Sequence, residues 1–344
     1  MTLNNNRRNI SEISWLYTFG VLLTIFGHSH SNDWTTFPSL PIDFIYSFHM
    51  PLFFCISGYL FAKSHSLEKN GFLKWIGDKS KRLLIPYFVI SAISFIPKTL
   101  IEKGSLTGIG LNELLQCFFA PRNNVWGHFW FLPVIFIFYL VFGLWKSFFY
   151  NSVKYKQFAA VGMLAVTLVL HFIKTDIEWL GIRDLCKFAV YFAIGFSACE
   201  VIKVKKLRKT GLIASTLVLI FVSVILFLKF RHNALVMFIE SILMLVACLF
   251  LSRLLSEKKL KCVDFLNENV FTFYIWSWPF QAVAEKVLTI FSVEWYVYTI
   301  VMFFIGAIAP CVIIVVYKKL KFINCNFLNY LLGFRVGQAY PKQP

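Results

Sequence analysis

Two histidines lie near the ends of the first two apolar runs, where an imidazole could accept or donate a proton. The first run reads SWLYTFGVLLTIFGHSHSN, and a helix over it places its small and polar residues on one face: Ser14, Tyr17, Gly20, Thr24 and His28. Tyr17 and His28 are eleven residues apart. They therefore point nearly the same way and lie about 16 Å apart along the axis. His28 is suited either to acid–base chemistry or to a plain hydrogen bond with a neighbouring helix.

The second apolar run, DFIYSFHMPLFFCISGYLF, carries His49 two positions before Pro51. Pro51 removes a backbone hydrogen bond, which a membrane helix tolerates where neighbours or water satisfy the freed carbonyl. His28 and His49 are both expected within a few turns of the same membrane face, so one cavity could hold both. A simple kink at Pro51 is the alternative.

Three cations occur in the segment DKSKRLLIPYF, which leads into the third apolar run: Lys79, Lys81 and Arg82. Ammonium and guanidinium groups are suited to an anionic, phosphate-bearing ligand. The composition alone favours the alternative, in which these charges set the membrane topology and contact lipid headgroups.

Aromatic and acidic side chains are candidates for binding a polar ligand. The fourth run opens WGHFWFLPVIF, in which Trp126, His128 and Trp130 indicate either an interfacial aromatic belt or a surface on which a sugar stacks. Glu240 lies well inside the eighth run, where a carboxyl group is either functional or half of an ion pair.

The composition places these residues among membrane helices. Of 344 residues, 58% are apolar and 15% are charged, whereas globular domains contain about 45–50% and about 25%. Mean hydropathy is +0.68. Such long apolar runs exclude a soluble enzyme, a disordered chain and a disulfide-stapled secreted domain. The net charge is +17, and the Lys and Arg residues that cause it lie between the apolar runs. They form no basic stripe interleaved with aromatic residues, so we expect no nucleic-acid partner.

Several motifs of other protein classes are missing from the sequence. The eight cysteines include no CxxC pair, and there is no Walker loop, HExxH, GxSxG or glycine-rich dinucleotide turn. We therefore expect no metal site, no ATP-driven transport and no lipase chemistry.

Ten apolar runs are candidates for membrane-spanning helices: 13–31, 42–62, 83–101, 129–149, 157–173, 184–202, 211–229, 233–252, 268–288 and 295–317. If all ten cross, one side carries 25 of the 34 Lys and Arg residues and the other side carries 9. The positive-inside rule then makes both termini cytoplasmic. We predict an all-α polytopic membrane protein that forms one integral domain over 1–344, without a separate soluble domain. Asp184 and Lys187, three residues apart, are predicted to form a structural pair.

Four segments occur in an order and spacing that resemble a known family: WLYTFGVLLTIFGHS, FIYSFHMPLFFCISGYLF, KSKRLLIPY and HFWFLPVIF. Together they resemble the bacterial membrane acyltransferase-3 family, and within it the fucose 4-O-acetylase-like enzymes that acetylate surface polysaccharides. The resemblance covers the whole chain. It implies transfer of an acetyl group from acetyl-CoA to a sugar hydroxyl, in a multi-pass protein of the bacterial cytoplasmic (inner) membrane.

The resemblance also implies roles for individual residues. The key histidine of the family matches His28, its FHxPLFFxISGY motif includes His49, and its RxxR motif for acyl-CoA handling is matched by residues 79–82. The family usually has Arg or Lys eleven residues before the key histidine, whereas Tyr17 stands here. Tyr17 can donate one hydrogen bond to the donor but carries no charge.

The implied reaction assigns His28 as the general base and His49 as its proton partner or a substrate ligand. Lys79, Lys81, Arg82 and Tyr17 would bind acetyl-CoA. The glycan acceptor, free or lipid-linked, would meet Asp43, Trp126, His128, Trp130 and Glu240. CoA is cytosolic whereas His28 is expected near the outer face, so either the acyl arm reaches through the bundle or the helix sits deeper.

Two other function classes remain open at this stage. A transporter of lipid-linked or anionic glycans would also have polar helix faces and broken helices. The presence of Tyr17 in place of the usual Arg or Lys would fit a non-catalytic assembly partner. The sugar, its hydroxyl and the oligomeric state do not follow from the sequence.

Overall fold

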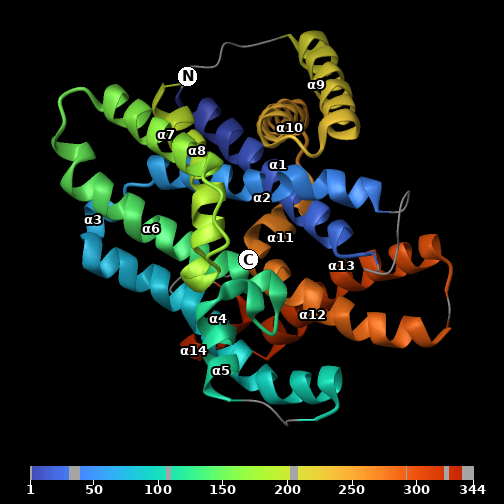
Figure 1. The fold of residues 1–344 in the computed structure, drawn as a ribbon. Helices are drawn as coiled ribbons and strands as arrows, with labels where there is room; N and C mark the ends of the chain where they lie inside the picture. The colour runs from blue at the N-terminus through green and yellow to red at the C-terminus, as the bar shows by residue number, and fades with distance from the viewer. Residues whose placement is uncertain are drawn as a thin grey trace. The chain divides into compact units, whose positions relative to one another are not determined.

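The chain folds almost entirely into helices (Figure 1). The computed structural model describes residues 2–30, 39–105, 110–201, 208–291, 293–320 and 325–334, and these ranges contain no strand. Their α-helices are α1 (Thr2–Gly27), α2 (Leu40–Lys63), α3 (Ser66–Asn70), α4 (Phe72–Lys103), α5 (Leu111–Phe119), α6 (Phe131–Phe148), α7 (Lys156–Phe172), α8 (Ile182–Val201), α9 (Lys209–Phe230), α10 (Ala234–Leu255), α11 (Lys261–Glu268), α12 (Val270–Leu288), α13 (Trp295–Lys319) and α14 (Asn326–Leu332). Short 3-10 helices accompany them: η1 (Pro121–Asn123), η2 (Gly127–Trp130), η3 (Tyr150–Ser152), η4 (Trp179–Gly181) and η5 (Thr289–Phe291). The predicted all-α class is confirmed.

Within the described residues, six helical segments are long and apolar enough to cross a membrane. They are α2, α4, α6 with its flanking 3-10 turns, α9, α10 and α13. The predicted runs 13–31 and 157–173 correspond to shorter apolar helices, and the runs 184–202 and 268–288 to α8 and α12. Residues 31 and 202, where two of these runs end, lie outside the described residues. The structure thus supports a multi-pass membrane protein, and ten crossings stay a prediction.

The third run belongs to a longer helix than its apolar residues suggest. The sequence predicts a connection over 63–82, but α4 begins at Phe72, so Lys79, Lys81 and Arg82 lie on the helix itself. Lys and Arg are good helix formers, and a charge ends an apolar run without ending a helix. The break falls instead at Gly71, whose φ of 75° favours glycine.

The chain divides into two compact units. Unit 1 comprises Met1–Lys63, Ala160–Leu168 and Val190–Cys311, and unit 2 comprises Ser64–Ala159, Val169–Ala189 and Val312–Pro344. Three helices, α7, α8 and α13, contribute residues to both units. The single integral domain expected over 1–344 stays a prediction.

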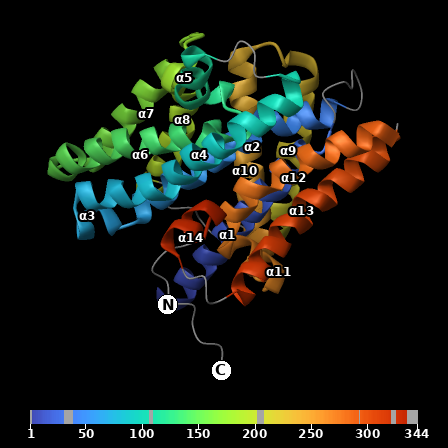
Figure 2. The same cartoon turned by 90° about the horizontal axis from the view of Figure 1, so that it is seen from below.

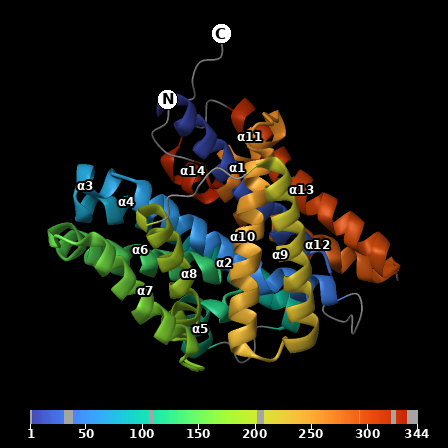
Figure 3. The same cartoon turned by 90° about the horizontal axis from the view of Figure 1, so that it is seen from above.

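Unit 1 is built around α1, which packs against α2, α10, α11 and α12. Figure 3 shows α9 and α10 side by side within this unit. Two glycines allow a close crossing of α2 and α8: a Cβ atom on Gly58 would collide with the Phe192 carbonyl group, and one on Gly195 with the Cys55 carbonyl group. Small residues commonly let the backbones of membrane helices approach in this way.

Unit 2 is built around α4 and α6, which lie alongside one another in Figure 2. The connection expected over 102–128 is itself structured, since it contains α5, η1 and η2. These elements contact each other and η4, and they form a cap that we call the Arg122 cap. The short C-terminal helix α14 packs on α4.

Candidate functional site

His28 follows the last residue of α1 and lies among aromatic side chains of unit 1. The His28 N–H donates to the Thr24 carbonyl at 3.1 Å, which continues the helical pattern by one residue. The His28 ring centroid is 6.1 Å from that of Tyr46 on α2 and 5.9 Å from that of Trp278 on α12. The residue is half-buried, so the surrounding rings shield much of the imidazole from solvent.

Tyr46 connects this end of α1 with His49. The Tyr46 hydroxyl donates to the Gly27 carbonyl at 2.7 Å, and the Tyr46 ring lies 5.2 Å from the His49 ring. His49 is 6% exposed. Its Nδ1 lies 3.0 Å from the Ile45 carbonyl. A carbonyl can only accept, so Nδ1 carries the hydrogen and Nε2 is the basic nitrogen.

The polar face predicted on α1 points into unit 1. Ser14 and Gly20 are buried, and Tyr17 and Thr24 are half-buried. Gly20 faces the Phe53 ring of α2 so closely that a Cβ atom would lie 2.8 Å from it. The predicted face therefore packs on α2, with Tyr17 and His28 along the same side of the helix.

The two acidic candidates of unit 1 differ in their surroundings. Asp43 is exposed in the first turn of α2. Glu240 on α10 is 0% exposed, and the hydroxyl groups of Ser47 and Ser241 lie beside it. Both hydroxyl groups already donate to backbone carbonyls. In the part of the chain that the structure describes, no cation pairs with Glu240, so the ion-pair alternative finds no support there.

The cations of α4 belong to unit 2 and have different exposures. The Lys79 Nζ lies 4.4 Å from the Tyr139 ring centroid and 5.7 Å from that of Trp75. Lys79 and Arg82 are half-buried one turn apart, whereas Lys81 is exposed. Aromatic faces hold an ammonium group without neutralising its charge. Phosphate binding by Lys79, Lys81 and Arg82 stays a prediction.

A salt bridge joins α3 to α6 in unit 2. The Lys146 ammonium on α6 lies 2.9 Å from the Glu68 carboxylate of α3, and their side chains are 5% and 36% exposed. Partial burial by itself raises the pKa of Glu68, but the hydrogen bond and the positive charge of Lys146 outweigh it. The net effect lowers the pKa of Glu68 below its ordinary value.

The Arg122 cap contains the aromatic candidates Trp126, His128 and Trp130. The Arg122 guanidinium carbon lies 3.8 Å from the Trp130 ring centroid, and the Trp130 ring stacks on Phe188 at 5.3 Å. Trp130 is 7% exposed. A sugar could stack on Trp130 only if one of these contacts opened, and such stacking stays a prediction.

Trp126 and His128 are more accessible than Trp130, since both are half-buried. The Lys98 Nζ lies 4.7 Å from the Trp126 ring centroid. The same ammonium group donates to the Val125 carbonyl. A sugar contact at Trp126 and His128 stays a prediction.

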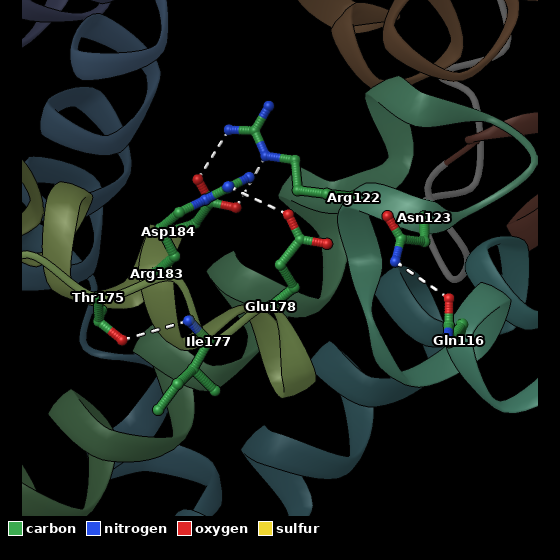
Figure 4. A network of polar contacts seen from close by, with 8 residues as sticks. All are labelled: Gln116, Arg122, Asn123, Thr175, Ile177, Glu178, Arg183 and Asp184. Atoms are coloured by element: carbon green, nitrogen blue, oxygen red, sulfur yellow. Dashed lines mark hydrogen bonds and ion pairs between the residues drawn. The ribbon is translucent and has the colours of Figure 1, made fainter. Parts of the chain in front are cut away.

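Figure 4 shows the charges that hold the Arg122 cap together. The Arg122 Nε and Nη2 donate to the two carboxylate oxygens of Asp184 at 2.8 and 2.7 Å. Asp184 is 2% exposed. The partner predicted for Asp184 was Lys187, whereas its bidentate partner is Arg122, 62 residues earlier in the chain. A guanidinium fork matches both carboxylate oxygens, which a single ammonium group does not.

The candidate residues thus fall into two groups. His28, His49, Tyr17, Asp43 and Glu240 belong to unit 1, while the α4 cations and the cap aromatics belong to unit 2. Sequence reasoning did not assign Tyr46, Trp278, Gln281 or Arg122 to a site. Tyr46 could have been found, because it stands one turn before His49 on the same helix. Trp278 and Gln281 lie about 250 positions from His28 and give no local signal.

The comparisons with known proteins agree with the resemblance at the level of the acyltransferase-3 family. A family model described as an acyltransferase domain (acyltransferase 3) matches residues 12–317, which is most of the chain. The matched region includes both histidines, the α4 cations and the Arg122 cap. No curated protein and no solved structure shows a significant match. The chain therefore belongs to the acyltransferase 3 family, and it carries the acyltransferase domain of that family on a set of membrane-like helices.

Proposed function

We propose that the chain is an integral membrane O-acetyltransferase of the fucose 4-O-acetylase-like type. It moves an acetyl group from acetyl-CoA to a sugar hydroxyl of a cell-surface polysaccharide such as O-antigen, capsule or exopolysaccharide. The observation that carries this proposal is the placement of His28, the residue that matches the key histidine of the family. It is half-buried at the end of α1, between Tyr46 and Trp278.

The proposed chemistry needs a base, because an alcohol is a weak nucleophile at neutral pH. The His28 imidazole takes the proton of the sugar hydroxyl while the hydroxyl oxygen attacks the thioester carbonyl. The carbon–sulfur bond then breaks, CoA leaves as a thiolate, and the imidazolium returns the proton to the sulfur. General base catalysis of this kind contributes about 10²–10⁴-fold. His49 is the second candidate, as a proton partner or a substrate ligand.

The donor is bound in this proposal by cations and by one phenol. Lys79 and Arg82 hold the CoA phosphates, with Lys81 as an outer contact, because guanidinium and ammonium groups bind phosphate oxygens through charge-assisted hydrogen bonds. Tyr17 lies on the same face of α1 as His28. Its hydroxyl replaces the usual cation and donates one hydrogen bond to the donor.

The acceptor side is proposed on the remaining candidates. Trp126 and His128 offer half-buried rings for a sugar. Trp130 is the third aromatic candidate, and Asp43 and Glu240 offer oxygens for the hydroxyl groups of the sugar. The glycan acceptor is free or lipid-linked. The proposal also includes ten crossings, two cytoplasmic termini and the bacterial inner membrane, which the distribution of Lys and Arg supports.

The test is a comparison of His28→Ala with His30→Ala. His30 is a matched control, because it is a half-buried imidazole two residues away whose Nδ1 meets the Gly27 carbonyl at 2.8 Å. The measurements are the O-linked acetate on surface polysaccharide and the transfer of labelled acetyl from acetyl-CoA by the purified protein. We expect His28→Ala to lose at least 100-fold in transfer and His30→Ala to stay within about threefold.

Other outcomes identify the rival functions. A transporter would lose delivery of polysaccharide to the surface in His28→Ala, with acetate per repeat unchanged. A non-catalytic assembly partner would tolerate the substitution in both measurements. Equal acetate in wild type, His28→Ala and a strain without the gene would refute the proposal for that polymer.

A further inference from the structure

Gln281 is a fully buried amide at the junction of three helices in unit 1. It stands on α12 with 0% exposure. Its Nε2 lies 3.0 Å from the Ile25 carbonyl of α1, 3.0 Å from the Ser29 Oγ and 3.1 Å from the Met302 carbonyl of α13. Two N–H groups shared among three acceptors hold these backbones together. A buried NH₂ group without such acceptors would be strongly unfavourable. Among the described residues the Oε1 of the same amide has no hydrogen-bond partner, so Gln281 is held through its Nε2.

Gly306 on α13 makes room for this amide. A Cβ atom at position 306 would lie 2.7 Å from the Gln281 Cδ and Nε2 and 2.9 Å from the Ile25 Cγ2. Any side chain at this position would displace either the amide or the end of α1. The slot is therefore fitted to a glutamine whose Nε2 faces α1.

Two of the three acceptors of Gln281 lie on either side of His28 in the chain. Ile25 is three residues before it, and Ser29 follows it directly with 0% exposure. The Ser29 Oγ donates to the Ile25 carbonyl at 2.6 Å, and the Ser29 N–H donates to the Phe26 carbonyl at 2.9 Å. These bonds close the last turn of α1 around the residue that carries the imidazole.

The same helix also contacts the imidazole ring. Trp278 stands three residues before Gln281 on α12, on the same face, and its ring centroid lies 5.9 Å from that of His28. One helix thus fixes the backbone at His28 through Gln281 and the ring through Trp278.

We propose that Gln281 is a positioning residue for His28, which it holds by fastening the last turn of α1 to α12 and α13. Only the effect on catalysis depends on the proposed function, and the fastening of α1 does not. Because transfer needs the imidazole within hydrogen-bond reach of the hydroxyl, a small displacement of the α1 end lowers the turnover rate more than it lowers substrate binding.

The experiment uses two variants with matched controls in the full-length protein. Gln281→Met keeps the shape but removes the donor, and Gln157→Met makes the same change at an exposed position of α7. Gly306→Ala pushes the amide, and Gly162→Ala adds the same methyl group where nothing lies within 4 Å. Hydrogen exchange by mass spectrometry is measured over residues 25–30. The kcat of acetyl transfer and the KM for acetyl-CoA are measured for the same proteins.

We expect exchange over residues 25–30 to rise at least tenfold in Gln281→Met and Gly306→Ala and to stay at the wild-type rate in both controls. The kcat should fall about 10- to 100-fold with KM within threefold. Unchanged exchange would overturn the positioning role whatever the activity. Raised exchange with unchanged kcat would overturn its link to catalysis. A wild type without transferase activity would refute the proposed function, and the exchange result would still decide whether Gln281 fastens α1.

Discussion

The end of α1 in unit 1 and the Arg122 cap in unit 2 are both polar clusters among apolar helices, but different forces hold them. At the end of α1, neutral groups bond to backbone carbonyls: Tyr46 to Gly27, and Gln281 to Ile25 and Met302. In the Arg122 cap, a guanidinium group is paired with a buried carboxylate and stacked on an indole ring. The hydrogen-bonding groups of the first arrangement are uncharged, whereas the second arrangement consists of one positive and one negative group.

The difference has a physical meaning for function. Neutral, directional bonds fix a backbone without adding a field that would alter an adjacent imidazole. A charge pair stabilises a loop only while both partners are present, since removal of one leaves an uncompensated buried charge. The same chain thus uses neutral bonds at the candidate catalytic group and charge pairs at the cap. Four predictions separate positions held by close packing from positions where a charge matters, from the largest expected effect to the smallest.

At the close crossing of α2 and α8, replacement of Gly58 by a larger residue should destabilise unit 1 strongly. Gly58→Leu would drive a side chain into the Phe192 backbone, which cannot move aside as a flexible side chain can. We expect a loss of about 3 kcal/mol or more, seen as loss of monodisperse protein and a lower unfolding temperature in detergent. The control is Gly77→Leu on α4, where nothing lies within 4 Å. Equal losses in the two variants would contradict the close crossing.

The Arg122 cap should depend on its charge pair as a unit. Arg122→Leu leaves the Asp184 carboxylate buried without its partner, and we expect a loss of about 3 kcal/mol in stability. Arg183→Leu is the matched control, because the Arg183–Glu178 pair is 39% and 32% exposed and is worth at most about 1 kcal/mol.

A double variant separates the charge pair from simple packing in the Arg122 cap. Arg122→Leu combined with Asp184→Leu should recover most of the loss, because no buried charge remains. Chemical or thermal unfolding of wild type, Arg122→Leu, Arg183→Leu and the double variant measures how much stability is recovered. A double variant no more stable than Arg122→Leu would show that charge is not what holds the cap.

Lys79 should act on donor binding rather than on stability. Lys79→Met keeps the apolar stem against Tyr139 and Trp75 but removes the charge. We expect the KM for acetyl-CoA to rise about tenfold with kcat within a factor of two, since a phosphate contact of this kind is worth roughly 1–2 kcal/mol. Lys74→Met, at an exposed position five residues earlier on α4, is the control, because Lys74 is not assigned to donor binding. An equal rise in both would assign the effect to overall charge.

The smallest expected effect is the pH dependence of the Glu68–Lys146 salt bridge. The pKa of Glu68 in the folded protein lies below its unfolded value of 4.5. The ionised group therefore stabilises the fold above that value, and this stabilisation is lost as pH falls through the folded pKa. The unfolding temperatures of wild type and Glu68→Gln should differ at pH 7, and the difference should shrink as the pH falls below 4.5.

A matched control makes this small pH effect interpretable. Glu257 pairs with Lys209 at 2.7 Å, but their side chains are 56% and 71% exposed. Glu257→Gln should leave the unfolding temperature nearly unchanged at both pH values, because water screens an exposed pair. A pH dependence of the same size in both variants would indicate a general charge effect.

The sequence by itself determined the helical class, the membrane environment and most of the apolar helices, because hydrophobic runs and helical periodicity are local properties. It also identified His28, His49 and the α4 cations as the chemical groups of interest. It placed the start of α4 too late, since apolar composition marks where lipid begins rather than where a helix begins.

Only the tertiary structure decided which residues surround these groups. Gln281 reaches the Ile25 carbonyl across 256 positions, Arg122 reaches Asp184 across 62, and Tyr46 reaches Gly27 across 19. Each bond depends on how closely two helices approach and on which face each one turns inward. Those quantities are set by side-chain packing between distant segments, as at Gly306, where the absence of one Cβ atom admits the amide that holds α1.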